Sequence, residues 1–93
     1  MTERQLERKL AEAVKAMGGT ALKFTSPGFA GMPDRIVLLP EGKIAFVEVK
    51  RPGEIPRPLQ KARHGMLRLL GYKVFVLDDN RQIGEILNAI SAS

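Results

Sequence analysis

The chain has no cysteine and no long apolar run, and each absence excludes a class of protein. Without cysteine there are no disulfides and no thiolate ligands for a metal. No stretch of about 18 apolar residues occurs, so no transmembrane helix is expected. The N-terminal segment MTERQLERKL carries too many charges for a signal peptide. We therefore expect a cytoplasmic protein, in a bacterial or phage-infected cell, with no membrane partner.

The 93 residues are enough for one domain with a modest core. Lysine and arginine total 15 against 10 aspartates and glutamates, and this net charge of +5 suits a polyanionic partner. No organic cofactor is expected. Much of the positive charge lies between positions 51 and 68, where Glu54 is the single acid. The basic residues of this run are Arg51, Arg57, Lys61, Arg63 and Arg68.

Apolar periodicity and turn residues predict seven elements, in the order helix, three strands, helix, strand, helix. The first helix begins at Thr2 and ends at Gly18-Gly19. The later elements are strands at 21–24, 34–39, 43–50 and 72–77, a helix over 59–70, and a last helix after Asp78 or Asp79. The stripe of the second helix that should face the core is Leu59, Ala62, Met66, Leu69 and Leu70. This order predicts a three-layer α/β domain with a mixed β-sheet flanked by helices.

Three charged residues lie in or beside the most apolar strands. Asp34 begins one strand of a predicted hairpin and Glu48 lies near the end of the other, so the two carboxylates should converge. Lys50, two residues after Glu48, projects from the same face. Two neighbouring carboxylates repel each other unless a cation lies between them. Mg²⁺ or Mn²⁺ would resolve this, since both prefer oxygen ligands, and the carbonyl of Val49 could supply one more.

The same residues carry a resemblance to a known family. Asp34 after Pro33, followed by Glu48-Val49-Lys50, resembles the PD-(D/E)xK nuclease signature. The surrounding sequence, PGFAGMPDRIVLLPEGKIAFVEVKRPGEIPRPLQ and later GYKVFVLDD, looks like the small stand-alone VRR-NUC domain of phages and bacteria. The resemblance covers almost the entire chain and implies the restriction-endonuclease-like fold. It also implies that Asp34 and Glu48 bind the metal and that Lys50 is the catalytic lysine.

The site of this family also contains a polar residue at the start of the second helix and an acid on the first helix. The resemblance assigns the polar position to Gln60. Two residues compete for the acid. The run ERKL, which starts at Glu7, resembles archaeal Holliday-junction resolvases and favours Glu7. The usual VRR-NUC position, three residues before the first core apolar residue, favours Glu3. We expect Glu7 and keep Glu3 as the alternative.

Each candidate also has a simpler structural interpretation. Glu48 and Lys50 could form an ion pair at a strand end, and Asp34 could be a turn residue. Gln60 could simply occupy the first turn of its helix. His64 is the only histidine, and a lone histidine on a helix is more often at the surface. It lies one helical turn beyond Gln60, so the alternative is that it faces the same cleft.

DNA contacts are expected from the basic run and from the glycine-rich loop at 25–33. Beside a phosphodiesterase site, Arg51, Arg57, Lys61 and Arg63 should bind the DNA backbone, which would make binding sensitive to salt. In the loop, Phe29 either packs inward or meets bases at a branch point. Ser26 could donate a hydrogen bond to a phosphate.

The sequence predicts a metal-dependent endonuclease that hydrolyses phosphodiester bonds in branched DNA such as Holliday junctions. Symmetric cutting of a four-way junction needs two active sites, so a homodimer is expected. An exposed edge strand or the apolar terminal helix could mediate it. The alternative is a non-catalytic module that binds branched nucleic acid on a nuclease fold. The presence of Asp34, Glu48, Lys50 and Gln60 together argues against that alternative.

Overall fold

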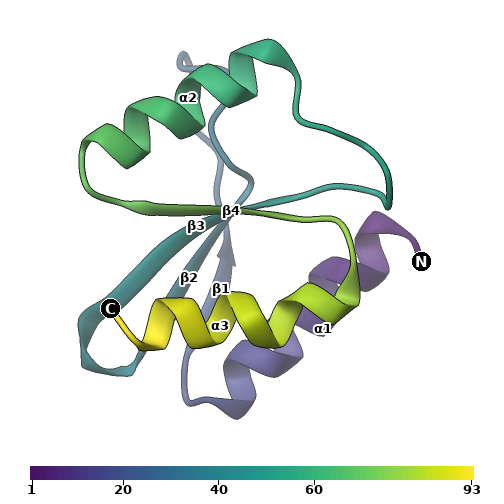
Figure 1. The fold of residues 1–93 in the computed structure, drawn as a ribbon, viewed down its shortest axis with the longest axis vertical. Coiled ribbons are helices and arrows are strands. Elements are labelled where there is room, and N and C mark those ends of the chain that lie inside the picture. The colour runs from purple at the N-terminus through teal and green to yellow at the C-terminus, as the bar shows by residue number, and fades with distance from the viewer.

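Four strands and three helices form three layers (Figure 1). The computed structural model describes all residues from 1 to 93. In chain order the elements are α1 (Glu3–Ala16), β1 (Thr20–Lys23), β2 (Arg35–Leu39), β3 (Lys43–Val49), α2 (Pro58–Leu69), β4 (Lys73–Leu77) and α3 (Ile83–Ser91), with short 3₁₀ turns at Pro40–Gly42 and Asn80–Gln82. The predicted order and the three-layer α/β fold class are confirmed. None of the helices has the length and apolar character of a membrane span.

The strands lie in the order β1-β2-β3-β4, so β1 and β4 are the two edges of the sheet. The first three strands form an antiparallel meander, and β4 pairs with β3 in parallel. A parallel pair needs a crossover connection, and α2 provides it across one face of the sheet. The crossover begins where the backbone N–H of Lys50 donates to the carbonyl of Leu77 at 2.9 Å. α1 and α3 cover the other face (Figure 1).

The two faces of β3 point toward different helical layers. Ala45, Val47 and Val49 point into the main core with α1 and α3, whereas Phe46 and Glu48 point toward α2. This alternation is the one expected of a strand that is covered by helices on both faces. A single buried carboxylate therefore projects into the layer between the sheet and α2.

α1 begins with two reciprocal hydrogen bonds. Oγ1 of Thr2 accepts from the N–H of Gln5 at 3.1 Å, and Oε1 of Gln5 accepts from the N–H of Thr2 at 2.8 Å. This capping box fixes the start of the helix at the predicted residue. Leu6, Leu10 and Val14 recur at helical spacing and are fully buried against the sheet. The first turn of α1 thereby lies at the end of the sheet where β2 begins.

α3 packs its apolar face into the core of its own chain. Ile83, Ile86, Leu87 and Ile90 are all buried there. The expectation that this helix could mediate a dimer is therefore wrong, because its apolar side is already covered. The edge strand β1 stays available, since most of its residues are exposed.

The predicted core stripe of α2 is also wrong. Leu69 and Leu70 are 89% and 67% exposed, whereas the buried residues of the helix are Gln60, His64 and Leu67. The physical reason lies on the sheet, where the buried Glu48 faces this helix. Two polar side chains of α2 turn inward to meet that carboxylate, so the leucines at the end of the helix turn outward.

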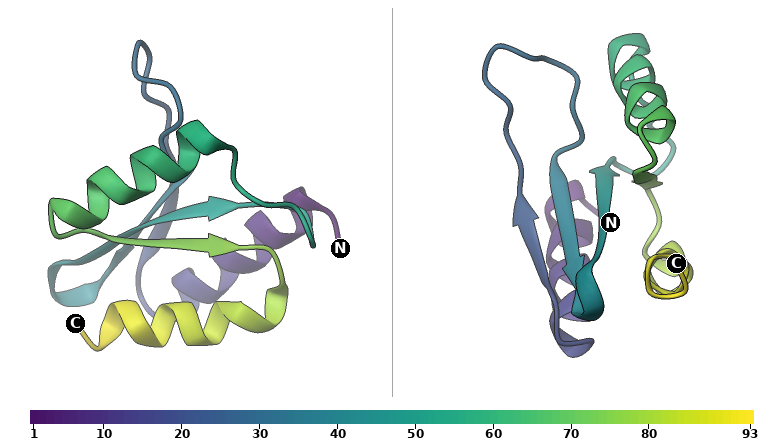
Figure 2. Two further views of the ribbon diagram at one scale, coloured as in Figure 1. Left: turned by 45° about the horizontal axis from the view of Figure 1, so that its top comes forward. Right: turned by 90° about the vertical axis from the view of Figure 1, so that its left-hand side faces the viewer.

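The connection between β1 and β2, residues 24–34, projects beyond the sheet beside the start of α2 (Figure 2). Its base is closed by the N–H of Phe24, which donates to the carbonyl of Asp34 at 2.8 Å. Pro33, just before Asp34, is fully buried. The base of this loop therefore fixes the backbone of Asp34 at the edge of the layer that contains Glu48.

The junction of α1 and β1 requires a glycine. A Cβ placed on Gly19 would lie 2.2 Å from the carbonyl oxygen of Leu38, which belongs to the backbone of β2 and cannot move aside. Gly19→Ala is therefore expected to lower the free energy of unfolding by ~2 kcal/mol or more. Gly65→Ala is the matched control, because nothing lies within 4 Å of its Cβ position and alanine favours a helix by roughly 1 kcal/mol. Urea unfolding measures both, and an unchanged Gly19→Ala protein would contradict this packing.

Candidate active site

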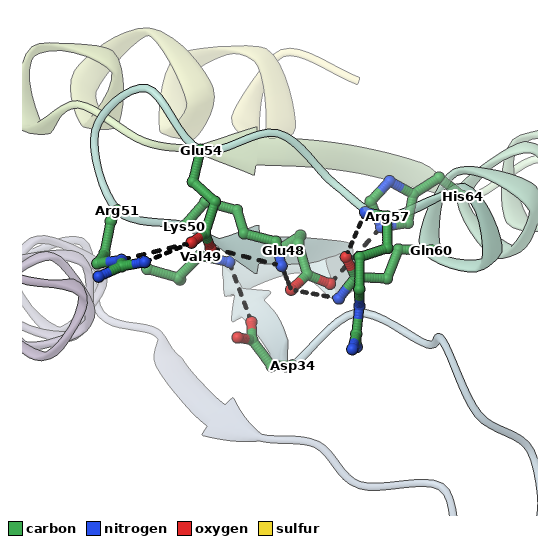
Figure 3. Close-up of polar contacts among 9 residues, drawn as sticks. All are labelled: Asp34, Glu48, Val49, Lys50, Arg51, Glu54, Arg57, Gln60 and His64. Atoms are coloured by element: carbon green, nitrogen blue, oxygen red, sulfur yellow. Dashed lines mark hydrogen bonds and ion pairs between the residues drawn. The ribbon is translucent and has the colours of Figure 1, made fainter.

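Asp34 and Glu48 lie opposite each other at the open end of the β2–β3 hairpin (Figure 3). The register pairs Arg35 with Val47, so the next position outward sets Asp34 opposite Glu48. The backbone N–H of Val49 donates to Oδ1 of Asp34 at 3.1 Å. The hairpin expected from the sequence thus brings the two carboxylates to one place.

The Glu48 carboxylate is held from two sides. Gln60, in the first turn of α2, donates from Nε2 to Oε2 of Glu48 at 3.3 Å. Oε1 of the same amide accepts from the N–H of Arg57 at 2.8 Å, which fixes the orientation of the amide. On the other side, Nζ of Lys50 lies 3.8 Å from Oε2 of Glu48 and 3.8 Å from Oε1 of Glu54. Glu48 itself is only 3% exposed.

His64 lies against Glu48, one helical turn beyond Gln60, and is 2% exposed (Figure 3). Its Nε2 lies 3.7 Å from Oε1 of Glu48, and neither atom has a hydrogen-bond partner. Burial lowers the pKa of His64, and the charges of Arg68 and Lys50 lower it further, which favours the neutral imidazole. The expectation of a surface histidine is wrong. The alternative is confirmed, because the four-residue spacing sets Gln60 and His64 on the same side of the helix, where both face Glu48.

Both candidate acids of α1 lie near Asp34. Carboxylate oxygens of Glu3, Glu7 and Asp34 lie within 4.8 Å of one another. Oε2 of Glu7 also accepts from Nη2 of Arg35 at 2.9 Å, whereas Glu3 makes no ion pair. Arg35 was not among the expected site residues. It follows Asp34 in the strand and so points to the face that α1 covers, which is the signal that could have found it.

Burial and mutual repulsion raise the pKa of both strand carboxylates. For Glu48 burial contributes most and the charge of Asp34 comes next, and the pKa rises to about 7 although Lys50 opposes the shift. Burial is also the main reason that the pKa of Asp34 is raised, and Glu7 and Glu3 add to it. A cation among these oxygens would remove the repulsion. The oxygen donors, including the unpartnered Oε1 of Glu48, fit a hard divalent ion.

The four basic residues expected to bind phosphate differ in their surroundings. The guanidinium of Arg51 donates to Glu54 at 3.0 Å. Arg63 donates to the backbone of the β1–β2 connection. Arg57 and Lys61 are exposed and make no ion pair. Arg57 and Lys61 are therefore the two basic residues most open to a phosphate.

Ser26 and Phe29 lie in the β1–β2 connection. The carbonyl of Ser26 accepts from the N–H of Phe29 at 3.1 Å. The ring of Phe29 is 39% exposed and lies under the guanidinium of Arg63, whose central carbon is 3.8 Å from the ring centroid. Phe29 therefore does not pack into the core.

Comparison with known proteins agrees with this geometry. No protein-family model matches the chain. A relative from Acyrthosiphon pisum secondary endosymbiont phage 1, named "Putative nuclease p44", is 48% identical over 89 residues, or 96% of this chain and 95% of the relative. A solved structure described as a VRR_NUC domain aligns with a TM-score of 0.87 at 34% identity, over 92% of this chain and 94% of the solved one. Both likenesses cover more than nine-tenths of this chain.

The raised pKa of Glu48 makes stability depend on pH. The ordinary pKa of 4.5 applies to the unfolded chain and a value of about 7 to the folded one, so the folded chain binds this proton more tightly. The contribution of Glu48 to stability is therefore greatest below pH 4.5 and is lost as the pH rises toward 7. Without divalent ions, we expect the contribution of Glu48 to the free energy of unfolding to fall by up to ~3 kcal/mol over this interval.

Glu48→Gln is the control for this dependence, because it removes the ionisation and keeps the shape. Its stability should vary less with pH and should exceed that of the wild type near pH 8. His64, whose pKa is lowered, contributes a slope of opposite sign in both proteins. Urea unfolding near pH 5 and near pH 8 measures the difference, and parallel pH profiles for the two proteins would contradict the shift.

Proposed function

Because the chain belongs to the VRR-NUC family of nucleases, we propose that it is a metal-dependent endonuclease that cuts branched DNA. The observation that carries the proposal is the opposition of Asp34 and Glu48 at the open end of one hairpin, with Lys50 beside Glu48. In a nuclease, paired carboxylates next to an ammonium group suit hydrolysis of a phosphodiester. The restriction-endonuclease-like fold supports the same interpretation.

The divalent ion would be held by Asp34, Glu48 and an acid of α1, with the carbonyl of Val49 as a further donor. When bound, Mg²⁺ or Mn²⁺ supplies charge neutralisation at the phosphate and a water of lowered pKa. The raised pKa values of Asp34 and Glu48 support this proposal, because they indicate that the two carboxylates are unfavourable when both are ionised without a cation. The core contacts of the hairpin keep these oxygens in place before substrate arrives.

Lys50 is the proposed catalytic lysine. Its ammonium lies between the carboxylates of Glu48 and Glu54, 3.8 Å from each, and this keeps it at the edge of the site. There it stabilises the negative charge that develops on the phosphate and orients the attacking oxygen. Gln60 acts through Glu48, since its amide is fixed at one end by the N–H of Arg57 and donates to the carboxylate at the other.

Of the two acids on α1, the contacts favour Glu3 as the residue that completes the site. Glu7 is already neutralised by Arg35 at 2.9 Å. Glu3 makes no ion pair, and its charge raises the pKa of Glu48 as well as that of Asp34. A carboxylate that acts on both strand acids is the better placed to share a cation with them.

Branched DNA, in particular a four-way junction, is the proposed substrate. A chain of 93 residues has little surface with which to read sequence, and the exposed Arg57 and Lys61 suit contacts with the DNA backbone. Symmetric cutting needs two sites, so the proposed active form is a homodimer, with β1 as the candidate contact. The phage origin of the nuclease relative supports action in the cytoplasm of a bacterial or phage-infected cell.

Asp34→Asn and Glu48→Gln are each expected to reduce cleavage of a four-way junction by at least ~100-fold in Mg²⁺ or Mn²⁺. DNA binding should persist, because Arg57 and Lys61 are unchanged. Cleavage assays on junction, flap, nicked and linear DNAs measure the activity and the preference. Solution mass, measured beside them, gives the oligomeric state.

Glu41→Gln is the matched control for these variants, because it removes a carboxylate at the closed end of the same hairpin. It should cleave like the wild type. Cleavage at wild-type rates by both Asp34→Asn and Glu48→Gln would refute the proposed site. A wild-type protein that binds junctions but never cuts them, and shows no cation site by calorimetry, would instead be the non-catalytic binding module.

Glu3→Gln and Glu7→Gln separate the two acids of α1. Glu3→Gln should reduce cleavage by at least ~10-fold and breaks no ion pair. Glu7→Gln should lower the free energy of unfolding by up to ~1 kcal/mol, through the lost pair with Arg35, and should affect cleavage less. Cleavage rates and urea unfolding measure both effects. The reverse ranking in cleavage would assign the role to Glu7.

A further inference from the structure

The β1–β2 connection holds Phe29 in a defined turn. The N–H of Phe29 donates to the carbonyl of Ser26 at 3.1 Å, which closes a four-residue turn. Pro27 occupies its second position, and Gly28 has the positive φ of 78° that the third position of a type II turn requires. The backbone at the tip is therefore shaped by its own sequence.

Two contacts attach this tip to α2. Gly31, with a φ of 89°, approaches the helix so closely that a Cβ would lie 2.8 Å from Cγ of Leu59 and 3.1 Å from Cγ of Arg63. Nε of Arg63 donates to the carbonyl of Ala30 at 2.8 Å. Although the connection projects beyond the sheet (Figure 2), it is fixed to the helix that also carries Gln60.

Arg63 also covers one face of the Phe29 ring, with its central guanidinium carbon 3.8 Å from the ring centroid. The ring belongs to neither hydrophobic cluster, and 39% of the residue is exposed. Core packing therefore does not explain why an aromatic residue stands here. Proteins that bind unpaired nucleic acid combine cations for the backbone with aromatic rings on which bases stack. The basic α2 and the ring of Phe29 provide both.

We propose that Phe29, supported by Arg63, is a stacking platform for an unpaired nucleobase of the DNA substrate. The platform is linked to the candidate site through the chain, because its loop leads into Asp34 and Arg63 belongs to the helix that carries Gln60. The inference rests on the proposed function and gives it a physical source of selectivity. A branch point offers unstacked bases, whereas an intact duplex keeps the faces of its bases covered.

The simpler role for the same contacts is to attach the loop to α2. In that role the loss of the ring would loosen the connection and weaken binding of every DNA alike. A stacking platform predicts a loss confined to DNA with an unpaired base. The two roles therefore differ in how Phe29 affects the ratio of the affinity for DNA with an unpaired base to the affinity for fully paired DNA.

The test measures binding without divalent ions, so it does not depend on cleavage. The two DNAs are a fully paired duplex and the same duplex with one unpaired 2-aminopurine, whose fluorescence falls when the base is stacked. Phe29→Ala is expected to bind the unpaired-base DNA at least ~5-fold more weakly than the wild type, to lose the quenching, and to bind the duplex equally well. Phe29→Trp should restore both affinity and quenching.

Two further variants complete the test: Leu69→Ala is a control, and Arg63→Lys tests the support of the ring. Leu69→Ala removes an exposed apolar side chain at the other end of α2 and should leave both affinities unchanged. Arg63→Lys keeps the charge but loses the planar face behind the ring. It should reduce the quenching while the salt dependence of binding stays the same.

Equal weakening of both DNAs by Phe29→Ala would overturn the platform and leave only the attachment role. The platform also fails if Phe29→Trp binds as weakly as Phe29→Ala, or if the wild type does not prefer the unpaired-base DNA. A wild-type protein that quenches the unpaired base but never cuts DNA with Mg²⁺ supports the platform and refutes the endonuclease. Normal cleavage with no dependence of binding on Phe29 refutes the platform alone.

Discussion

The burial of the Glu48 carboxylate is the constraint on which the rest of this small fold depends. A carboxylate inside a protein needs partners, and here they come from two sides. Gln60 approaches from α2 and Lys50 follows directly after β3, whereas the charge of Asp34, just before β2, repels the carboxylate. The same carboxylate explains why α2 turns a polar side to the sheet. Without a cation, burial and the neighbouring acid hold the pKa of Glu48 at about 7, so the group is poised between its two charge states.

The two faces of the sheet have different tasks. The face toward α1 and α3 carries a continuous core of 13 buried apolar residues, whereas the cluster on the α2 face has three. Most of the hydrophobic stabilisation therefore comes from one side, which leaves the other side free to hold polar groups. α1 joins the two tasks, because its apolar stripe packs in the core while its first turn brings Glu3 close to Asp34.

Local patterns in the sequence were enough to predict the order of the elements and the convergence of Asp34 with Glu48. Each depends on alternation or on turn residues within a short stretch. The buried face of α2 could not be predicted in this way, because the buried Glu48, 12 residues before Gln60, decides which side turns inward. The ion pair of Glu7 with Arg35 spans 28 residues and leaves no local pattern either. These features belong to the tertiary contacts, which periodicity does not describe.

The crossover before α2 is tied at both ends by backbone groups. The N–H of Lys50 donates to β4, and the N–H of Arg57 donates to Gln60. Between them, Glu54 reaches back to Lys50, and after Glu54 no side chain is buried until the helix begins. An insertion after Glu54 would shift neither Glu48 nor Gln60, whereas an insertion next to Asp34 would displace a carboxylate of the site. In evolutionary terms, the segment after Glu54 is where this domain can lengthen and acquire a new recognition element while its chemistry stays intact.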